Sequence, residues 1–357
     1  MTSIRVAHAG ADYEVIVGDL GGALPKLAAM ANGVRLPVVS DQRVFNLHGA
    51  KLADIAMPDP ILVDEGETAK NWSSLASVVE RLAALDVKRG TLIVALGGGS
   101  VGDVAGLAAS LFKRGCPIIH VPTTLLAQAD SAIGGKTAID GAGQKNLVGT
   151  FHHPLLVIAD PALLETLDAR QLRSGYAEVV KYGLIDDPGF FAWCEANGGL
   201  LLDGDLPARQ AALEHCVRAK ARIVSADPND TSGTRALLNF GHTFGHAIET
   251  MGRHAILHGE AVAVGMILAL QLSNQLGLCA RSDAERVRTH FGSVGLPTEL
   301  AQVGLSGCAD QLLALMIQDK KADRFGIVLV LAHGVGKSTL VRGIEPATLE
   351  QFLRDAA

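Results

Sequence analysis

The sequence predicts two structural parts: an α/β domain with a parallel, Rossmann-like sheet, followed by a mostly α-helical domain. The chain has 357 residues, enough for one large domain or two ordinary ones. Up to about residue 160, short apolar runs alternate with helical segments, the pattern of a parallel sheet covered on both faces. From residue 161 onward the apolar residues recur mainly with helical spacing. We therefore place the domains at residues 1–160 and 161–357.

The strands expected in the first part are compact apolar runs, most of which end in Gly, Asp or Thr. Residues 4–10 and 13–18 alternate apolar and polar side chains, as the strands of an edge hairpin do. The other expected strands lie within residues 35–41, 59–66, 91–99, 116–124 and 155–160. Helical segments such as residues 72–87 separate several of them, so parallel pairing is the expected arrangement.

The second part is expected to be built from helices. The clearest helical patterns cover residues 176–185, 208–224, 234–251 and 260–278. Only residues 327–341 have the pattern of a late strand pair. A cleft between the two parts is the place where we expect the functional site.

Composition narrows the class of protein. Hydrophobic residues make up 48% of the chain and aromatic residues 4%, so a sizeable aliphatic core is expected. The net charge of −6 argues against a general nucleic-acid binder. The five cysteines form no CxxC motif, which favours a reducing compartment over a disulfide framework. The N-terminus lacks the pattern of a signal peptide, and the longest apolar stretch, residues 261–270, is too short to span a bilayer. We expect a soluble, cytoplasmic protein.

A glycine-rich turn is the first candidate binding feature. Gly97, Gly99 and Gly102 follow an expected strand and begin an expected helix, with Asp103 in its first turn. Glycines let backbone N–H groups approach a phosphate, and the helix N-terminus favours negative charge. The motif alone is equally compatible with an ordinary tight turn. An acid about 20 residues further on would complete the dinucleotide fingerprint, but the acid at a strand end, Asp41, precedes the glycines instead. A bound dinucleotide would therefore occupy a related, non-standard fold, and Asp41 is kept as a cofactor-binding candidate.

Two histidines raise the question of a metal site. His242 and His246 lie four residues apart, on one face of an expected helix. Zinc sites use this spacing, but Thr243 occupies the position of the Glu in an HEXXH motif. A lone HxxxH pair is more often two polar residues at a helix interface.

Further candidate ligands make a metal site more plausible. His258 is followed by Glu260, and Glu178 precedes Lys181 by one helical turn. A catalytic metal takes about three protein ligands and keeps an open position. One glutamate and two histidines from different helices would meet that requirement.

Basic residues beside glycines or within apolar stretches form a second set of candidates. They are Lys136, Lys145, Lys220, Arg235, Lys320 and Lys321. Each alone is an ordinary surface charge. Gathered in one pocket, they would suit an anionic substrate that carries phosphate and carboxylate groups.

Seven collinear segments resemble the 3-dehydroquinate synthases, a family of sugar-phosphate cyclases. The segments are residues 97–103, 122–140, 145–149, 175–185, 237–249, 257–266 and 319–321. The resemblance extends over nearly the whole chain. It implies an N-terminal NAD-binding α/β domain and a C-terminal, mostly helical metal-binding domain.

The resemblance also implies which residues bind metal and cofactor. One divalent metal, usually Zn²⁺ and otherwise Co²⁺, would be held by Glu178, His242 and His258. The NAD-binding set would be Glu67, Lys70, Gly98, Gly99, Ser100, Val101, Gly102, Asp103, Thr123, Thr124, Lys136, Lys145, Leu163, Leu164, Glu165 and Thr166.

The substrate-binding residues implied by the resemblance are mostly basic or amide side chains. They are Asp130, Lys136, Asn146, Lys181, Lys220, Arg235, Asn239, His246, Lys320 and Lys321. Arg114 resembles an arginine that the family inserts across a dimer interface, which implies a homodimer. The family usually has Glu four residues before the arginine that matches Arg235, but Thr231 stands there, and we assign the role to the preceding Asp230.

The reaction implied by the resemblance converts 3-deoxy-D-arabino-heptulosonate 7-phosphate to 3-dehydroquinate and phosphate, a step of the shikimate pathway. NAD would oxidise a substrate hydroxyl transiently, a metal would polarise that hydroxyl, and β-elimination, reduction and an aldol closure would follow. The leaving phosphate would serve as base for its own elimination, so the protein would mainly orient and stabilise. The alternatives are another sugar-phosphate cyclase, a metal-dependent polyol dehydrogenase, and a binding protein that keeps NAD without catalysis.

Overall fold

The computed structural model describes residues 1–7, 12–227, 233–253, 255–318 and 327–356. Its contacts divide the chain into two compact units. The first contains Met1–Asp168 and Leu206–Asn229, and the second contains Ala169–Asp205 and Asp230–Ala357. A single boundary after residue 160 would place helix α7 (Leu206–Ala226) in the second part, whereas its contacts group it with the first. The Gln210 amide of α7 donates to the Val17 carbonyl at 3.0 Å, which ties the helix to the sheet of the first unit.

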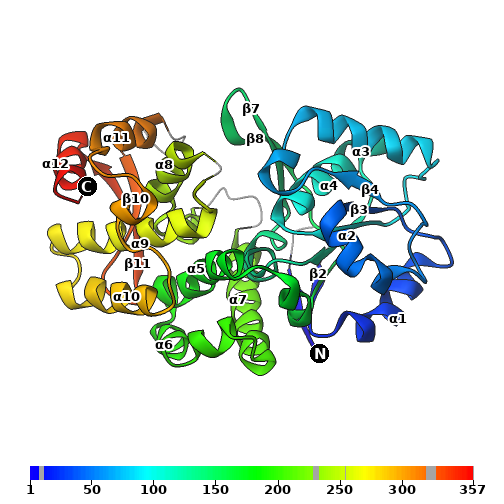
Figure 1. Cartoon of the computed structure of the whole chain (residues 1–357), viewed down its shortest axis with the longest axis horizontal. Coiled ribbons are helices and arrows are strands. Elements are labelled where there is room, and N and C mark those ends of the chain that lie inside the picture. Colours follow the sequence, from blue (N-terminus) through cyan, green and yellow to red (C-terminus); the bar gives the residue numbers. More distant parts are fainter. Residues whose placement is uncertain (8–11, 228–232, 254, 319–326, 357) are drawn as a thin grey trace. The chain divides into compact units, whose positions relative to one another are not determined.

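The first unit is built on a seven-stranded sheet of order β1-β2-β9-β6-β5-β3-β4 (Figure 1). Only the edge hairpin β1–β2 is antiparallel, and the other pairs are parallel, which confirms the Rossmann-like prediction. The strands are β1 (Thr2–Val6), β2 (Tyr13–Val17), β3 (Val38–Asp41), β4 (Ile61–Val63), β5 (Ile93–Gly97), β6 (Ile118–Pro122) and β9 (Leu156–Ala159).

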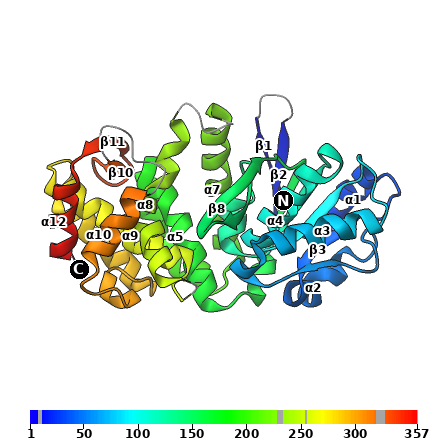
Figure 2. The same ribbon diagram turned by 90° about the horizontal axis from the view of Figure 1, so that it is seen from above.

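Both faces of this sheet are buried because alternate residues of the central strands point to opposite sides. On β5, Ile93 and Ala95 belong to one core cluster, and Val94 and Leu96 belong to the other. The helices of this unit include α1 (Leu20–Ala31), α2 (Gln42–His48), α3 (Trp72–Ala84) and α4 (Gly99–Leu111). They surround the strands in the blue and cyan part of Figures 1 and 2. A separate hairpin of β7 (Lys136–Gly141) and β8 (Gln144–Phe151) packs on α4.

The strand order places two sequence features side by side. Strand β3 lies between β4 and β5, so the chain reverses its direction of travel across the sheet at this point. Ligands of open α/β sheets bind at the carboxyl ends of the strands at such a switch point. Asp41 ends β3 and Gly97 ends the neighbouring β5. The glycine-rich turn is therefore located where this fold ordinarily binds a ligand.

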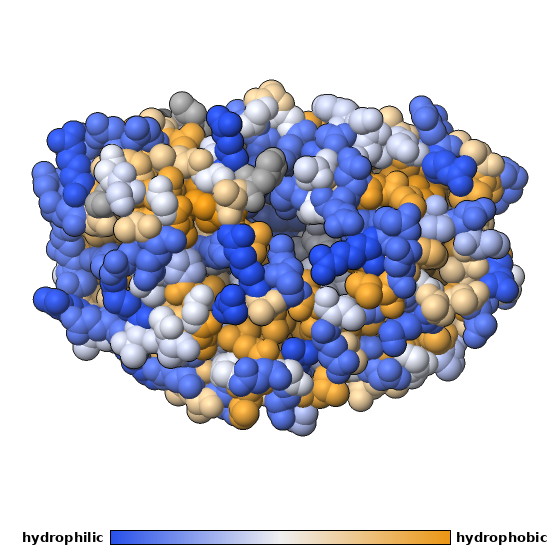
Figure 3. Space-filling view, in the orientation of Figure 1, coloured by the Kyte–Doolittle hydropathy of each residue, from blue (hydrophilic) through white to orange (hydrophobic). Residues whose placement is uncertain are grey.

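The second unit is mostly helical, as the sequence predicts. Its helices are α5 (Ala169–Asp186), α6 (Pro188–Leu202), α8 (His242–Gly252), α9 (His258–Gln275), α10 (Arg281–Ser293), α11 (Ala309–Gln318) and α12 (Pro346–Ala356). The expected late strand pair is the antiparallel hairpin of β10 (Ile327–Ala332) and β11 (Ser338–Ile344). Among the described helices, none combines the length and the hydropathy that a membrane span requires. Hydrophilic residues predominate on the molecular face that Figure 3 shows.

Glycines bring the backbones of α8 and α9 into direct contact. A Cβ built on Gly265 of α9 would lie 2.2 Å from the carbonyl oxygen of Gly241 and 2.9 Å from the nitrogen of Gly245. Gly241 precedes α8 with a positive φ of 77°, and a Cβ there would lie 2.6 Å from the backbone nitrogen of Met266. This close approach requires glycine, and it positions two helices that each begin with a histidine.

Replacing Gly265 with alanine is expected to destabilise the protein by about 3 kcal/mol, because overpacking against backbone forces the two helices apart. The matched control is Gly292→Ala in α10, where an added Cβ would meet no atom within 4 Å. That control should stabilise by about 0.5 kcal/mol through helix propensity. Urea unfolding followed by circular dichroism measures both changes. Equal stabilities of the two variants would contradict the close-packing interpretation.

Candidate active site

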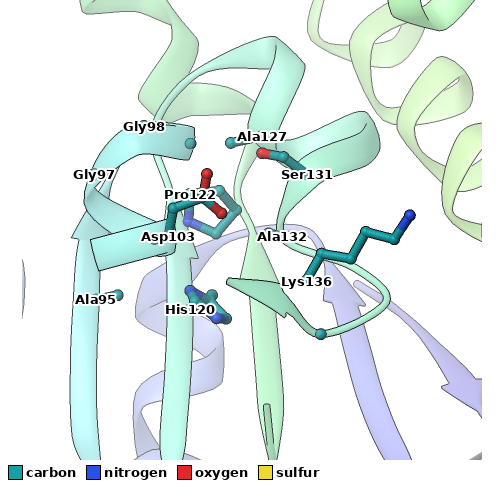
Figure 4. A pocket seen from close by; sticks show the side chains of 13 residues that line it. Ala95, Gly97, Gly98, Asp103, His120, Pro122, Ala127, Ser131, Ala132 and Lys136 are labelled. Atoms are coloured by element: carbon teal, nitrogen blue, oxygen red, sulfur yellow. The ribbon is translucent and has the colours of Figure 1, made fainter. Parts of the chain in front are cut away.

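The glycine-rich turn forms one side of a pocket in the first unit. Gly97, Gly98, Gly99, Gly102 and Asp103 line it together with Ala95, His120, Pro122, Ala127, Ser131, Ala132, Gly135 and Lys136 (Figure 4). No side chain of the N-cap residue Gly98 blocks the first N–H groups of α4, which therefore remain available to an anion. A Cβ on Gly97 would lie 2.6 Å from the side chain of Val101, so the tight turn requires glycine there.

The threonines and the acid predicted for cofactor binding lie around this turn in different ways. The backbone N–H of Thr123 donates to the carbonyl of Gly97 at 3.0 Å. The hydroxyl of Thr124 accepts from the backbone of Ala127 at 3.2 Å. Asp41 is buried and caps α2, since its carboxylate accepts from the backbone N–H of Val44 at 2.7 Å. This hydrogen bond caps the helix, and the role of Asp41 in cofactor binding stays a prediction.

An ion-pair cluster centred on the buried Lys70 lies beside the glycine-rich turn. The Nζ of Lys70 is 2.6 Å from Oδ2 of Asp103 and 4.0 Å from Oε2 of Glu67. Ser100 donates to Glu67 at 3.1 Å. Burial would lower the pKa of Lys70, but the carboxylates of Asp103 and Glu67 outweigh burial and raise it, so the ammonium is favoured. The structure thus brings four of the predicted cofactor residues together.

The β7–β8 hairpin is joined to the same cluster through Asn146. The Lys70 ammonium also donates to the side-chain oxygen of Asn146, and the Asn146 backbone N–H donates to Asp140 at 2.8 Å. Asn146 has a positive φ of 52°, which Asn tolerates better than most residues. A predicted substrate residue and a predicted cofactor residue are therefore in direct contact in this unit.

A second pair of predicted substrate residues is also in contact. The Nζ of Lys220 on α7 lies 2.9 Å from Oδ1 of Asp130 and donates to the Asp130 backbone carbonyl at 2.7 Å. Lys220 is 5% exposed, so this cation is held in place within the first unit.

The remaining candidates of the first unit differ in accessibility. Leu163 and Leu164 are buried in the short 3₁₀ segment Pro161–Thr166, and their part in cofactor binding stays a prediction. Thr166 forms a hydrogen bond of 2.9 Å with the ring of His48. Burial lowers the pKa of Arg209, and the negative charge of Glu165 offsets part of that decrease. Lys136 is exposed at the start of β7, Lys145 is half-buried in β8, and Arg114 is exposed in the 3₁₀ turn Phe112–Arg114 with a positive φ of 64°.

His120 is a pocket residue that sequence reasoning missed. It stands on β6, is 6% exposed, and its ring lies below Asp103 in the view of Figure 4. No hydrogen bond joins its side chain to any described residue. Burial, assisted by the charge of His152, lowers the pKa of His120 to about 4. The imidazole is therefore neutral at physiological pH. Within a strand of apolar residues, no spacing pattern distinguishes such a histidine from a core position.

This buried histidine is expected to make the protein acid-sensitive. The unfolded chain binds the proton near pH 6.5 and the folded chain only near pH 4, so stability falls as the pH drops through that window. Between about pH 7 and about pH 5, the wild type should lose about 2 kcal/mol more than His120→Gln. Urea unfolding at the two pH values measures the difference. Parallel losses in both proteins would show that His120 does not titrate in this way.

In the second unit, three predicted ligands converge. Glu178 lies in α5, and His242 and His258 are the first residues of α8 and α9. Glu178 Oε1 is 3.4 Å from His242 Nε2 and 3.5 Å from His258 Nε2. One ligand atom from each residue lies within 4.8 Å of the others. The backbone N–H of Gly259 donates to the hydroxyl of Ser174 at 3.0 Å, which anchors the start of α9 to α5. Ser174 lies one helical turn before Glu178 on α5.

The hydrogen bonds of the two histidines show that the site fits a metal. His242 Nδ1 lies 3.1 Å from the carbonyl of Phe240, which can only accept, so Nδ1 carries the proton. His258 Nδ1 lies 3.2 Å from a carboxylate oxygen of Glu249. The Nε2 atoms therefore face Glu178, the arrangement found in metal-binding histidines. Burial lowers the pKa of His242 well below its usual value, which keeps the ring neutral and able to ligate.

The charge around His258 also favours a cation. Burial alone would lower the pKa of His258, but the carboxylates of Glu178 and Glu249 beside its two ring nitrogens outweigh burial and raise the pKa to about 10. A positive charge is therefore stabilised between the two carboxylates. A divalent metal on the Nε2 side would supply that charge.

The HxxxH pair is divided by the structure. His246 lies one turn after His242, with ring centroids 5.4 Å apart, and is not among the three convergent ligands.

The other substrate residues predicted in the second unit are buried or take part in local contacts. Lys181, 1% exposed, forms an ion pair with Glu178. Arg235 is buried in the 3₁₀ segment Thr234–Asn239, and Asn239 donates to the Ala236 carbonyl at 3.2 Å. The predicted residues Asp230, Lys320 and Lys321 lie outside the described residues.

Comparison with known proteins connects these features to one family. Sequence profiles described as 3-dehydroquinate synthase N-terminal and C-terminal match residues 60–174 and 175–322. A 3-dehydroquinate synthase of Bradyrhizobium sp. strain BTAi1 is 45% identical over 98% of this chain and 95% of that protein. One from Zymomonas mobilis is 48% identical over 94% of this chain and 92% of that protein.

Solved structures share the fold. A 2-deoxy-scyllo-inosose synthase complexed with carbaglucose-6-phosphate, NAD⁺ and Co²⁺ has a TM-score of 0.88 and 27% identity over 100% of both chains. The 2-epi-5-epi-valiolone synthase of Streptomyces hygroscopicus, with NAD⁺ and Zn²⁺ bound, has a TM-score of 0.88 and 29% identity over 98% of both chains. An NADH-dependent butanol dehydrogenase of Thermotoga maritima, at 17% identity and a TM-score of 0.67 over 96% of both chains, shares the fold alone. The two profile matches and the full-length relatives together show that the chain belongs to the 3-dehydroquinate synthase family.

Proposed function

We propose that the chain is an NAD- and metal-dependent carbon–oxygen lyase that converts 3-deoxy-D-arabino-heptulosonate 7-phosphate to 3-dehydroquinate and phosphate. The observation that carries the proposal is the convergence of Glu178, His242 and His258, with both histidine Nε2 atoms facing the carboxylate. This donor set of one carboxylate and two imidazoles suits a catalytic divalent metal with an open position. Zn²⁺ or Co²⁺, the ions in the two related cyclase structures, would fit it. When bound, the metal would polarise a substrate hydroxyl as a Lewis acid.

The glycine-rich turn supports the cofactor part of the proposal. The N–H groups at the start of α4 would hold the NAD pyrophosphate, and the Lys70–Asp103 pair beside them would fix the shape of the pocket. When bound, NAD would accept a hydride from the substrate and later return it, so that the overall reaction is redox-neutral.

The chain's own residues would bind and orient an anionic sugar phosphate. Lys220, held against Asp130 in the first unit, and Lys181 and Arg235, buried in the second, supply cations for phosphate and carboxylate groups. Asn146, Asn239 and His246 would add hydrogen bonds to the substrate. We assign Asp230, Lys320, Lys321, Lys136 and Lys145 to the same binding functions on the basis of their motifs. Most of these side chains would bind and orient the charged groups of the substrate rather than transfer protons. This suits a reaction to which the protein contributes mainly by holding the substrate in a reactive geometry.

The proposal extends to assembly and location. We propose a cytoplasmic homodimer in which Arg114, exposed beside α4, contributes to the phosphate site of a partner subunit. Replacing Arg114 with alanine in a mixed dimer with an otherwise inactive subunit would test this contribution.

The test of the proposed function is a phosphate-release assay in which the protein is given 3-deoxy-D-arabino-heptulosonate 7-phosphate, NAD and Zn²⁺. The protein should release phosphate over many turnovers without accumulating NADH, and a chelator should abolish release. A polyol dehydrogenase would instead accumulate NADH in step with turnover. Release that survives complete metal removal would overturn the metal assignment.

A further inference from the structure

Glu249 is a buried carboxylate that no motif assigned to the site. It lies in α8, seven residues after His242, and is 6% exposed. Residues seven apart on a helix share one face. One face of α8 therefore carries a candidate ligand, His242, and a carboxylate that contacts another candidate ligand, His258, at 3.2 Å.

The two histidines are held by acceptors of different chemistry. His242 donates to a backbone carbonyl, which is neutral and fixed by the chain. His258 donates to Glu249, whose side chain carries a charge. A carboxylate that accepts from a metal-binding imidazole orients the ring and raises the basicity of its other nitrogen. The acceptor behind His258 is thus a charged side chain, whereas the acceptor behind His242 is the backbone.

The place of His258 in its helix makes this contact important. His258 is the first residue of α9, so the preceding turn that would restrict its side chain is absent. The helix start is anchored through its backbone, by Leu257 to Glu260 at 2.9 Å and by Gly259 to Ser174 at 3.0 Å. These bonds fix the backbone but leave the rotation of the imidazole open. The bond to Glu249 is the described contact that sets the ring with Nε2 toward Glu178.

We propose that Glu249 is a positioning residue that sets the affinity of the Glu178–His242–His258 site for its divalent metal, by orienting His258 and making it a stronger ligand. The inference rests on the proposed function in one respect, namely that this site binds a metal. Glu249 itself touches neither metal nor substrate in this role.

Direct metal binding tests the inference. The full-length protein, stripped of metal, would be titrated with Zn²⁺ and Co²⁺ against a chromophoric chelator, for wild type, Glu249→Gln and Glu249→Ala. Glu249→Gln keeps an acceptor for Nδ1 but loses the charge, and we expect about 10-fold weaker binding. Glu249→Ala loses both, and we expect about 100-fold weaker binding and a changed visible spectrum of bound Co²⁺.

The control is Glu195→Gln, which removes a carboxylate paired with Arg286 in the same unit. It should bind both metals with wild-type affinity. Wild-type affinity in the two Glu249 variants would overturn the inference, and so would a loss of metal-free stability with unchanged metal affinity. If Glu249→Ala fails to fold, the nearly isosteric Glu249→Gln decides alone. A wild type that binds neither ion would instead overturn the proposed metal-dependent function, and the inference with it.

Discussion

Replacing His242 with alanine should abolish metal binding and turnover, whereas replacing His246 should abolish turnover alone. His242 directs Nε2 at Glu178 from 3.4 Å, while His246 stands one turn further along α8 outside the three convergent ligands. Loss of a ligand should weaken metal binding by about 100-fold or more, since even residues behind the ligands contribute up to that factor. The His246 variant should keep stoichiometric metal but lose about 100-fold or more in kcat. Metal content by elemental analysis and phosphate release measure the two effects.

His333→Ala is the matched control, because that histidine is exposed between β10 and β11. It should retain both metal and activity. Equal loss of metal in the His242 and His246 variants would restore the simple HxxxH pair as the metal site.

Replacing Lys181 with methionine should destabilise the metal-free protein and eliminate turnover, yet strengthen metal binding. Lys181 and Glu178 are each 1% exposed and form an ion pair. Removing one partner of such a pair leaves a buried charge uncompensated, at a cost of about 3–5 kcal/mol. A divalent metal beside Glu178 would replace the missing positive charge, so Zn²⁺ should recover much of the lost stability. Thermal unfolding with and without Zn²⁺, alongside the metal affinity, tests this coupling.

Lys181→Arg provides the comparison, since it keeps the charge while changing the shape of the cation. It should lose less metal-free stability than Lys181→Met. Two results would contradict the role of Lys181 as the counter-charge of Glu178. One is a methionine variant that is as stable as wild type without metal. The other is a gain in stability on adding Zn²⁺ that is no larger in the methionine variant than in wild type.

Local patterns in the sequence identified the strands of the parallel sheet and several helices, but neither the β7–β8 hairpin nor every assignment to a unit. The apolar runs at 35–41, 91–99 and 116–124 each contain a strand of the parallel sheet. Periodicity also identifies α7 as a helix, yet its membership of the first unit depends on contacts such as Thr2 with Glu214 at 2.6 Å. Those two residues are 212 positions apart, so no local pattern predicts their contact.

The candidate metal site was likewise only partly predictable from local spacing. Spacing alone pairs His242 with His246, and only the match of separate motifs proposes Glu178 and His258 as the partners of His242. The folded chain brings those three together because glycines let α8 and α9 touch. Glu249 and His120 were missed because each is a buried polar residue within an apolar pattern. For Glu249, the shared helix face with His242 was a usable signal.

The most direct test compares substrates side by side in one phosphate-release assay with NAD and Zn²⁺. One arm contains 3-deoxy-D-arabino-heptulosonate 7-phosphate. The other contains glucose 6-phosphate, the parent sugar of the carbaglucose-6-phosphate bound to the related 2-deoxy-scyllo-inosose synthase. We expect phosphate and 3-dehydroquinate in equal amounts from the heptulosonate, and no release from glucose 6-phosphate. Release from glucose 6-phosphate alone, or no release from either sugar by the metal- and NAD-loaded protein, would contradict the proposed function.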